Sequence, residues 1–197
     1  MLVTFVVMLG SRSALLLAAC LCAGCETKSS IDFSPFHGLY RIDSDTLNPN
    51  ACDAEGAAVA GSKPLLVIFS LLTLEYGNLA LADSCTDPVA CRARAANPVA
   101  SIGTAADFGA TFSRITSDGQ GLTGTSFSLD ITTGLYAQVG DNLLVRSGGG
   151  IRIETRNHEL PCQTSDGKCD QTATIAAAAS APCTDFRVVN ATFQEPL

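Results

Sequence analysis

The sequence predicts a mainly β protein, either a single antiparallel β-barrel or a two-sheet sandwich, held together by disulfides. Short stretches of alternating polar and apolar residues recur between turn signals rich in Gly, Asp and Asn, a pattern typical of sandwiches and barrels. Only one short segment, near residues 88–96, has the pattern of a helix. Six cysteines follow residue 25, and this even number favours three disulfides in an exported domain.

The first strand is predicted over residues 39–45, where polar and apolar side chains alternate. Tyr40 and Ile42 share one face of this strand, and Asp43 and Asp45 share the other. We therefore expect the two aspartates on a solvated outer face and the two apolar side chains in the core.

Two further strands and the helix follow. Residues 65–76 are the most apolar stretch of the exported part, too short to span a membrane as a helix, and their β-branched residues favour a buried strand. A turn is expected at Gly77, leading into a short strand over 79–82. For the helix of residues 88–96, Asp87 is placed to cap the N-terminus.

The rest of the chain is predicted to form a meander of short strands. Residues 140–142 and 147–150 are expected as turns, because they are rich in Gly, Asp and Asn. The alanines of residues 173–181 favour a helix, but Thr172 and Ile175 favour a strand, and we expect a strand. The strands expected here cover residues 108–116, 122–131, 135–139, 143–146, 151–156 and 186–193.

The spacing of the six cysteines suggests one pairing, although sequence alone leaves the others open. Two pairs would form short local staples, and a third would join the start of the domain to its end, where a long closed loop gives the largest stabilisation. Zinc sites need close Cys-x-x-Cys pairs, which the domain lacks, so no metal site is predicted. The suggested disulfides are Cys85–Cys91, Cys162–Cys169 and Cys52–Cys183.

The N-terminal residues have the order of an export signal. Arg12 precedes an apolar run over residues 13–21, and small residues then lead to Cys25. This order resembles a bacterial lipoprotein signal peptide with its lipobox, in which the cysteine after the cleavage site carries the acyl chains. Cys20 is the alternative site, but cleavage before Cys25 leaves the longer apolar core and a polar segment after it.

The lipoprotein resemblance implies three parts of the chain. Residues 1–24 are the signal peptide, residues 25–37 are the lipidated cysteine with a flexible tether, and residues 38–197 form a single β-rich domain. It also implies a lipid-anchored protein of the bacterial cell envelope, held to the membrane by its acyl chains. Glu26, directly after the cysteine, favours the outer membrane if the cell is Gram-negative.

The domain also resembles lipocalin-type barrels. Gly38-Leu39-Tyr40 stands where lipocalins usually carry Gly-x-Trp, and Arg187 on the last predicted strand matches the basic residue of the family. The resemblance implies an antiparallel barrel. A jelly-roll or other two-sheet sandwich is the alternative.

Composition and motifs argue against several classes of function. The net charge of −7 and an isoelectric point near 4.6 exclude a nucleic-acid partner, which would select for basic faces. The histidines, His37 and His158, are expected in the tether and in a loop, and no nucleophile motif accompanies them. We therefore predict no enzyme activity and no cofactor. A hydrolase of carbohydrates or esters is the alternative, with Asp43 and Asp45 as its carboxylates.

These observations predict a binding or structural module of the envelope. Its expected partners are the membrane, through the lipid, and either a small apolar ligand in the barrel or another envelope protein. An apolar ligand needs a roomy interior that the phenylalanines would line, whereas small barrels are usually filled by their own side chains, and we expect these rings to fill the core. The rings concerned are Phe69, Phe108, Phe112, Phe127, Phe186 and Phe193.

Overall fold

The computed structural model describes residues 31–73, 77–97, 107–129 and 136–197. The predicted signal peptide with Cys20, the lipidation site Cys25 and the turn expected after residue 131 lie outside the described residues.

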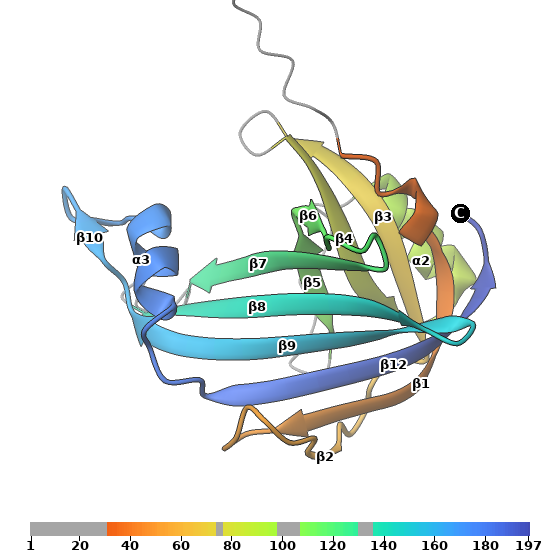
Figure 1. Ribbon diagram of the computed structural model, residues 1–197, viewed down its shortest axis with the longest axis horizontal. Helices are drawn as coiled ribbons and strands as arrows, with labels where there is room; N and C mark the ends of the chain where they lie inside the picture. Colours follow the sequence, from red (N-terminus) through yellow and green to blue (C-terminus); the bar gives the residue numbers. More distant parts are fainter. Residues whose placement is uncertain (1–30, 74–76, 98–106, 130–135) are drawn as a thin grey trace, which may run out of the picture. The chain divides into compact units, whose positions relative to one another are not determined.

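One antiparallel sheet curls into a nearly closed barrel (Figure 1). Its strand order is β5-β4-β3-β1-β12-β9-β8-β7-β6, and β2 pairs with β1 at the side. Apart from short inserted strands, neighbours in the sheet are neighbours in the chain, and β1 pairs with β12 where the chain returns to its start. The long strands are β1 (Gly38–Asn48), β3 (Leu65–Thr73), β4 (Gly77–Cys85), β7 (Gly121–Leu129), β8 (Tyr136–Ser147), β9 (Gly150–Pro161) and β12 (Asp185–Glu195).

The remaining elements are short. The 3₁₀ helix η1 and the helices α2 and α3 lie outside the sheet order, and β10 pairs only with β11. Their bounds are η1 (Ser34–Phe36), β2 (Ala57–Ala58), α2 (Pro88–Ala96), β5 (Gly109–Phe112), β6 (Arg114–Ile115), β10 (Thr164–Ser165), β11 (Lys168–Cys169) and α3 (Gln171–Ala178).

The barrel closes where β5 meets β7. Ser113 N donates to the Thr123 carbonyl at 2.9 Å, and Thr111 N donates to Ser126 Oγ at 3.2 Å. An ideal Cβ at Gly124 would lie 2.4 Å from the Thr111 carbonyl oxygen, so only glycine permits this close approach. The predicted barrel is therefore confirmed, and the sandwich alternative is excluded.

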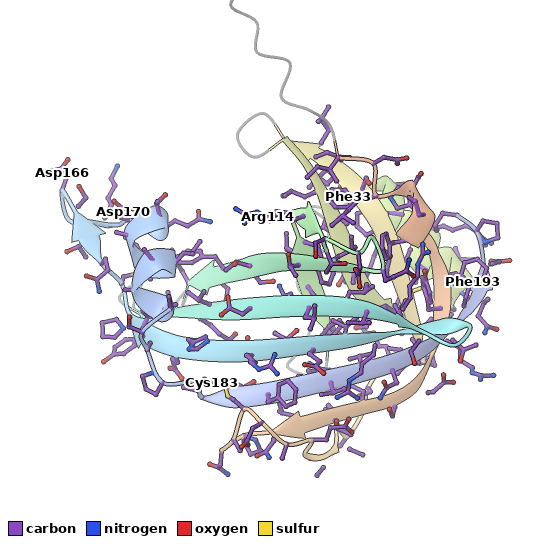
Figure 2. The ribbon with its side chains drawn as sticks, viewed as in Figure 1. Phe33, Arg114, Asp166, Asp170, Cys183 and Phe193 are labelled. Atoms are coloured by element: carbon purple, nitrogen blue, oxygen red, sulfur yellow. A yellow bond between two sulfur atoms is a disulfide. The ribbon has the colours of Figure 1, made fainter. Side chains whose placement is uncertain are left out.

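The two ends of the barrel differ. At the end we call the plugged end, β1 begins, β12 ends, and Phe33 and Phe36 from around η1 insert among the inward-facing side chains. The opposite end, the open end, is where β1 and β9 end and β12 begins. Figure 2 shows Cys183 and Phe193 near opposite ends of β12.

The plugged half of the interior is filled by apolar side chains. Phe33, Phe36, Leu66, Leu144 and Ile153 are all at most 1% exposed and belong to one cluster. Each such residue stabilises the fold by about 1.5–3 kcal/mol relative to an exposed position. This end of the barrel leaves no apolar chamber among its described residues.

Both helices cover the outer face of the barrel. Helix α2, predicted at residues 88–96, is confirmed, and the Asp87 carboxylate caps it by accepting bonds from Val89 N and Ala90 N at 2.9 Å. It packs on Val67 and Phe69 of β3. Neither helix in the described part of the chain has the length and apolarity needed to cross a membrane.

The three predicted disulfides are present, between the predicted partners. Each one has a cysteine at or just beyond a strand terminus at the open end: Cys85 ends β4, Cys162 follows β9, and Cys183 precedes β12. The Cα atoms of the longest-range pair, Cys52–Cys183, lie 6.1 Å apart.

Two secondary-structure predictions are wrong. The turn expected at residues 140–142 is instead the middle of β8, because each of its residues pairs with β9 on one side and β7 on the other. The strand expected at residues 173–181 is instead helix α3, which Asp170 caps by accepting a bond from Ala173 N. The side-chain cap and the alanines prevail over the β-branched residues of this segment.

The tether prediction is also wrong for its last residues. Phe33 and Phe36 are buried, and the Arg146 guanidinium donates to the Pro35 carbonyl at 2.6 Å and lies 4.5 Å from the Phe36 ring centroid. The folded domain therefore begins before residue 38.

Candidate functional site

The open end holds the largest cavity described here, with a volume of about 660 Å³. This volume falls within the range of small-molecule sites. Strands β7, β8, β9 and β12 supply most of its wall, through inward-facing residues that continue the apolar rows of the plugged half. The residues that line it are Leu47, Pro49, Asp107, Phe108, Gly109, Ser126, Phe127, Ser128, Gln138, Gly140, Thr155, Asn157, Glu159, Thr184, Asp185 and Arg187.

A buried ion pair forms the floor of this cavity. Arg187 on β12 meets Asp45 on β1 in a two-pronged contact, with Nε 2.8 Å from Oδ1 and a terminal nitrogen 2.7 Å from Oδ2. Ser62 Oγ donates a further bond of 2.6 Å to Asp45, and the guanidinium lies 5.2 Å from the Phe108 ring centroid. Asp45 is almost fully buried, so the pair offsets charges that would otherwise be costly there.

A register shift in β1 brings Asp45 into the barrel. The pairing with β12 is irregular between Ile42 and Ser44, which adds one residue to β1 and reverses the alternation beyond it. The prediction that Asp43 and Asp45 share an outer face is therefore wrong. Asp43 stays outside, where hydrogen bonds from Thr192 and Arg41 lower the pKa of its carboxyl. The two carboxylates cannot act as the pair that a hydrolase would use.

A hydrogen-bonded polar cluster fixes the wall between β7 and β9. The Asn142 side-chain amide donates to Ser126 Oγ at 2.7 Å and to the Thr111 carbonyl at 3.1 Å, and its oxygen accepts from Thr155 Oγ1 at 2.9 Å. Gly140 beside it gives room for Asn157, whose oxygen would lie 2.8 Å from a Cβ there. These side chains are held before any ligand arrives.

Two carboxylates face the cavity at its mouth. Asp185 Oδ1 accepts a bond of 2.7 Å from Asn157 Nδ2. Glu159 lies two residues further along β9 on the same face and is exposed. Within the described part of the chain, no hydrogen bond or ion pair holds the Glu159 carboxylate.

Charged residues behind the wall are paired with one another. Asp107 forms ion pairs with Lys63 and, at 3.9 Å, with Arg94, which also contacts Asp83 at 2.8 Å. Burial raises the pKa of the Asp83 carboxyl, and the Arg94 guanidinium opposes that rise. Helix α2 thereby connects to the rim of the cavity through Arg94.

Both histidines lie away from the cavity. His158 is buried in β9, with Nδ1 3.0 Å from the Ala181 carbonyl and Nε2 3.5 Å from Asp141, so the expected loop position is wrong. His37 Nε2 lies 2.7 Å from Ser70 Oγ at the plugged end, and burial lowers the pKa of its imidazole. No group of three or more metal-ligating side chains occurs among the residues that the structure describes.

Tyr40 and Arg187, the two residues that resemble those of lipocalins, do not contact each other. Tyr40 donates to the Phe36 carbonyl at 2.8 Å and stacks edge-on against Phe193, whereas Arg187 lies on the floor of the cavity. Burial raises the pKa of the Tyr40 hydroxyl, with Arg146 opposing the shift.

The phenylalanines are distributed over several sites instead of lining one chamber. Phe108 and Phe112 fill the barrel core, Phe69 packs under α2, and Phe127 packs beside α3. The expectation that the rings fill the core is confirmed for Phe108 and Phe112 and is wrong for Phe193, which is 42% exposed.

The sequence analysis missed Asp185 and Glu159 as site residues, although a signal was present. Along β9 and β12, the rows that contain Ile153 and Val189 continue at every second residue with polar side chains. A face that changes from apolar to polar along one strand indicates where a core ends and a polar cavity begins.

Comparisons with known proteins add no assignment, since no protein-family model, curated protein or solved structure matches the chain.

Proposed function

We propose that this protein is a lipid-anchored envelope module whose barrel binds a small polar ligand in the cavity at the open end. The observation that carries this proposal is a cavity of about 660 Å³ whose polar wall is already fixed by hydrogen bonds and an ion pair. A preformed site lowers the entropic cost of binding, since few side chains need to be ordered.

The proposed ligand is polar because the interior of the barrel has a filled apolar half and an open half that contains polar groups. The sequence left a small apolar ligand or another envelope protein as alternative partners, but the apolar half of the barrel is filled by buried side chains such as Phe36 and Leu144. The remaining space is bounded by hydroxyl, amide and carboxylate groups together with apolar surface. An apolar molecule there would bury carboxylate oxygens of Asp185 and Glu159 that have no partner among the described residues, at a cost of about 1–3 kcal/mol for each buried group.

The anchor in this proposal is Cys25, with Cys20 as the alternative. Five residues separate Cys25 from Ile31, so the connection spans at most about 20 Å when extended. Asn78 at the start of β4 donates to the Ile31 carbonyl at 2.6 Å, which fixes the entry of the chain at the plugged end. A lipid at Cys25 would keep the plugged end near the membrane and leave the open end accessible.

Thermal unfolding with a fixed set of probes tests the binding function. The probes are 1,4-diaminobutane, glucose, succinate and hexanol, added to the wild type and to Ser128→Trp. Ser128 lies in the exposed mouth, so the large ring should obstruct the cavity without disturbing the core. A bound ligand at 100 times its Kd stabilises a fold by about 2.7 kcal/mol.

We expect at least one of the three polar probes to raise the Tm of the wild type and not that of Ser128→Trp. Stabilisation by hexanol alone, by none of the probes, or equally in both proteins would contradict the proposal.

Intact mass spectrometry of the membrane-extracted protein tests the anchor. The expected mass corresponds to a chain that begins at an acylated Cys25, and reduction should add about six protons for three disulfides. A mass without acyl chains would refute the lipid anchor.

A further inference from the structure

Several hydrogen-bond donors around the cavity are already in use. Arg187 directs three of its nitrogens to the Asp45 carboxylate and the Asp107 carbonyl. The side-chain amide of Asn157 donates to Asp185, and Thr155 Oγ1 donates to Asn142. A ligand that offers only acceptors would compete with these existing bonds.

Acceptors, by contrast, remain available. The Glu159 carboxylate accepts no hydrogen bond among the described residues, and Asp185 uses only one of its two oxygens there. In the wall itself, buried Asp107 is held by ion pairs with Lys63 and Arg94. Of the carboxylates that line the cavity, those without such partners among the described residues are therefore the ones at its mouth.

The charge balance of the cavity is negative. Asp45 neutralises Arg187, and Lys63 and Arg94 together neutralise Asp107 and Asp83. No cation within the described residues pairs with Asp185 or Glu159, and the whole chain has a net charge of −7. Two negative charges therefore face the cavity without a counterion from this part of the protein.

The two carboxylates lie within reach of one small molecule. Asp185 pairs with Asn157 across β12 and β9, and Glu159 is the next residue of β9 on the same face. Such diagonal neighbours have Cβ atoms about 7–8 Å apart. Leu47 adds apolar surface to the same wall, which suits a short methylene spacer.

We propose that the cavity binds a small organic amine whose ammonium groups donate hydrogen bonds to Glu159 and Asp185. The ammonium supplies a positive charge and N–H donors to two carboxylates that have no counterion among the described residues. This inference rests on the proposed binding function and names the chemical class of its ligand.

Calorimetric titration with a series of four-carbon probes tests the chemical class. The three probes have the same chain length but differ in charge. 1,4-Diaminobutane carries two positive charges, 1,4-butanediol is uncharged, and succinate carries two negative charges. The wild-type protein should bind the diamine at least tenfold more tightly than the diol, and succinate should not bind. Added salt should weaken the binding of the diamine, because salt screens the attraction between charges near the surface.

Conservative variants test the two carboxylates. Glu159→Gln and Asp185→Asn keep the side-chain shape and remove one charge each. Each variant should lower the affinity for the diamine by about tenfold or more, which is the usual contribution of a hydrogen bond to a charged group. Glu195→Gln, on β12 at the plugged end, is the matched control and should bind as the wild type does.

The outcomes separate this inference from the binding function. If succinate or the diol bound the wild type more tightly than the diamine, and Ser128→Trp abolished that binding, the amine would be refuted as the ligand class. The cavity would still be a binding site. Tighter binding of Ca²⁺ or tetramethylammonium than of the diamine would also overturn the inference, since neither can donate a hydrogen bond. Binding of no probe to the wild type, in calorimetry or in thermal unfolding, would overturn both proposals.

Discussion

The two ends of this barrel are stabilised by different interactions. At the plugged end, Phe33 and Phe36 fill the interior and exclude water. At the open end, polar side chains surround a cavity, while the Cys52–Cys183 disulfide and the Arg187–Asp45 ion pair join parts of the chain that are distant in sequence.

This difference has a physical reason. A polar cavity cannot be closed by hydrophobic packing, so the strands around it gain little from burial. Covalent cross-links restrict the unfolded chain and need no buried apolar surface at the site they join. The open end thereby keeps its shape around a space that a ligand can enter.

The largest effect is expected from removing the disulfide between residues distant in the chain. Cys52→Ser with Cys183→Ser opens a link between residues 131 apart, which the chain-entropy model values at about 5 kcal/mol of unfolding free energy. Cys162→Ser with Cys169→Ser, for residues seven apart, should cost about 2.5 kcal/mol. Urea unfolding measures both, and an equal or reversed ranking would contradict the proposed role of the long-range link.

Truncating the plug should have the next largest effect. Phe36→Ala removes a fully buried ring and should lower the unfolding free energy by about 4 kcal/mol. Phe193→Ala, the same change at a ring that is 42% exposed, should cost only about 1 kcal/mol, mainly through its contact with Tyr40. Similar losses in the two variants would show that the plug is not a centre of stability.

Breaking the floor of the cavity should cost somewhat less. Arg187→Met leaves the Asp45 carboxylate buried without its partner, and we expect a loss of about 3 kcal/mol. Adding Asp45→Leu should restore much of the loss, because both charges are then absent. Arg156→Met, at an ion pair on the outer surface, is the control and should cost less than about 1 kcal/mol. A double variant no more stable than Arg187→Met would argue against the ion-pair explanation.

The smallest effect concerns pH at the plugged end. Burial lowers the pKa of His37, with Asp32 opposing the shift, so the unfolded chain binds a proton at a pH where the folded chain does not. The His37 contribution to stability is therefore present above the ordinary imidazole pKa of about 6.5 and is lost as pH falls through the window below it. Chemical unfolding at a series of pH values should show a smaller loss in His37→Gln than in the wild type. An unchanged pH profile would refute this assignment.

Local sequence signals predicted the strands β9 and β12 and the disulfides, but not the plug, because Phe33 and Phe36 were assigned to the tether. Alternation located β9 and β12, and cysteine spacing gave the pairs that the structure contains. Alternation could not reveal the extra residue between Ile42 and Ser44, because a bulge arises from pairing with a distant strand. The inward position of Asp45, and with it the floor of the cavity, could not be predicted for this reason.

Long-range pairing also explains the misplaced turn. Gly140-Asp141-Asn142 has the composition of a turn, but both neighbouring strands pair with it and extend it. Asn142 consequently lies inside the barrel and organises the cavity wall, a role that composition alone does not indicate.

The measurement that most directly tests the division between the two ends is a map of amide chemical shifts during titration with 1,4-diaminobutane. We expect the largest changes at Thr155, Glu159 and Asp185, which line the cavity, and none beyond the noise at Phe36 and Tyr40. Shifts concentrated at the plugged end, or spread evenly over the surface, would contradict a binding site at the open end.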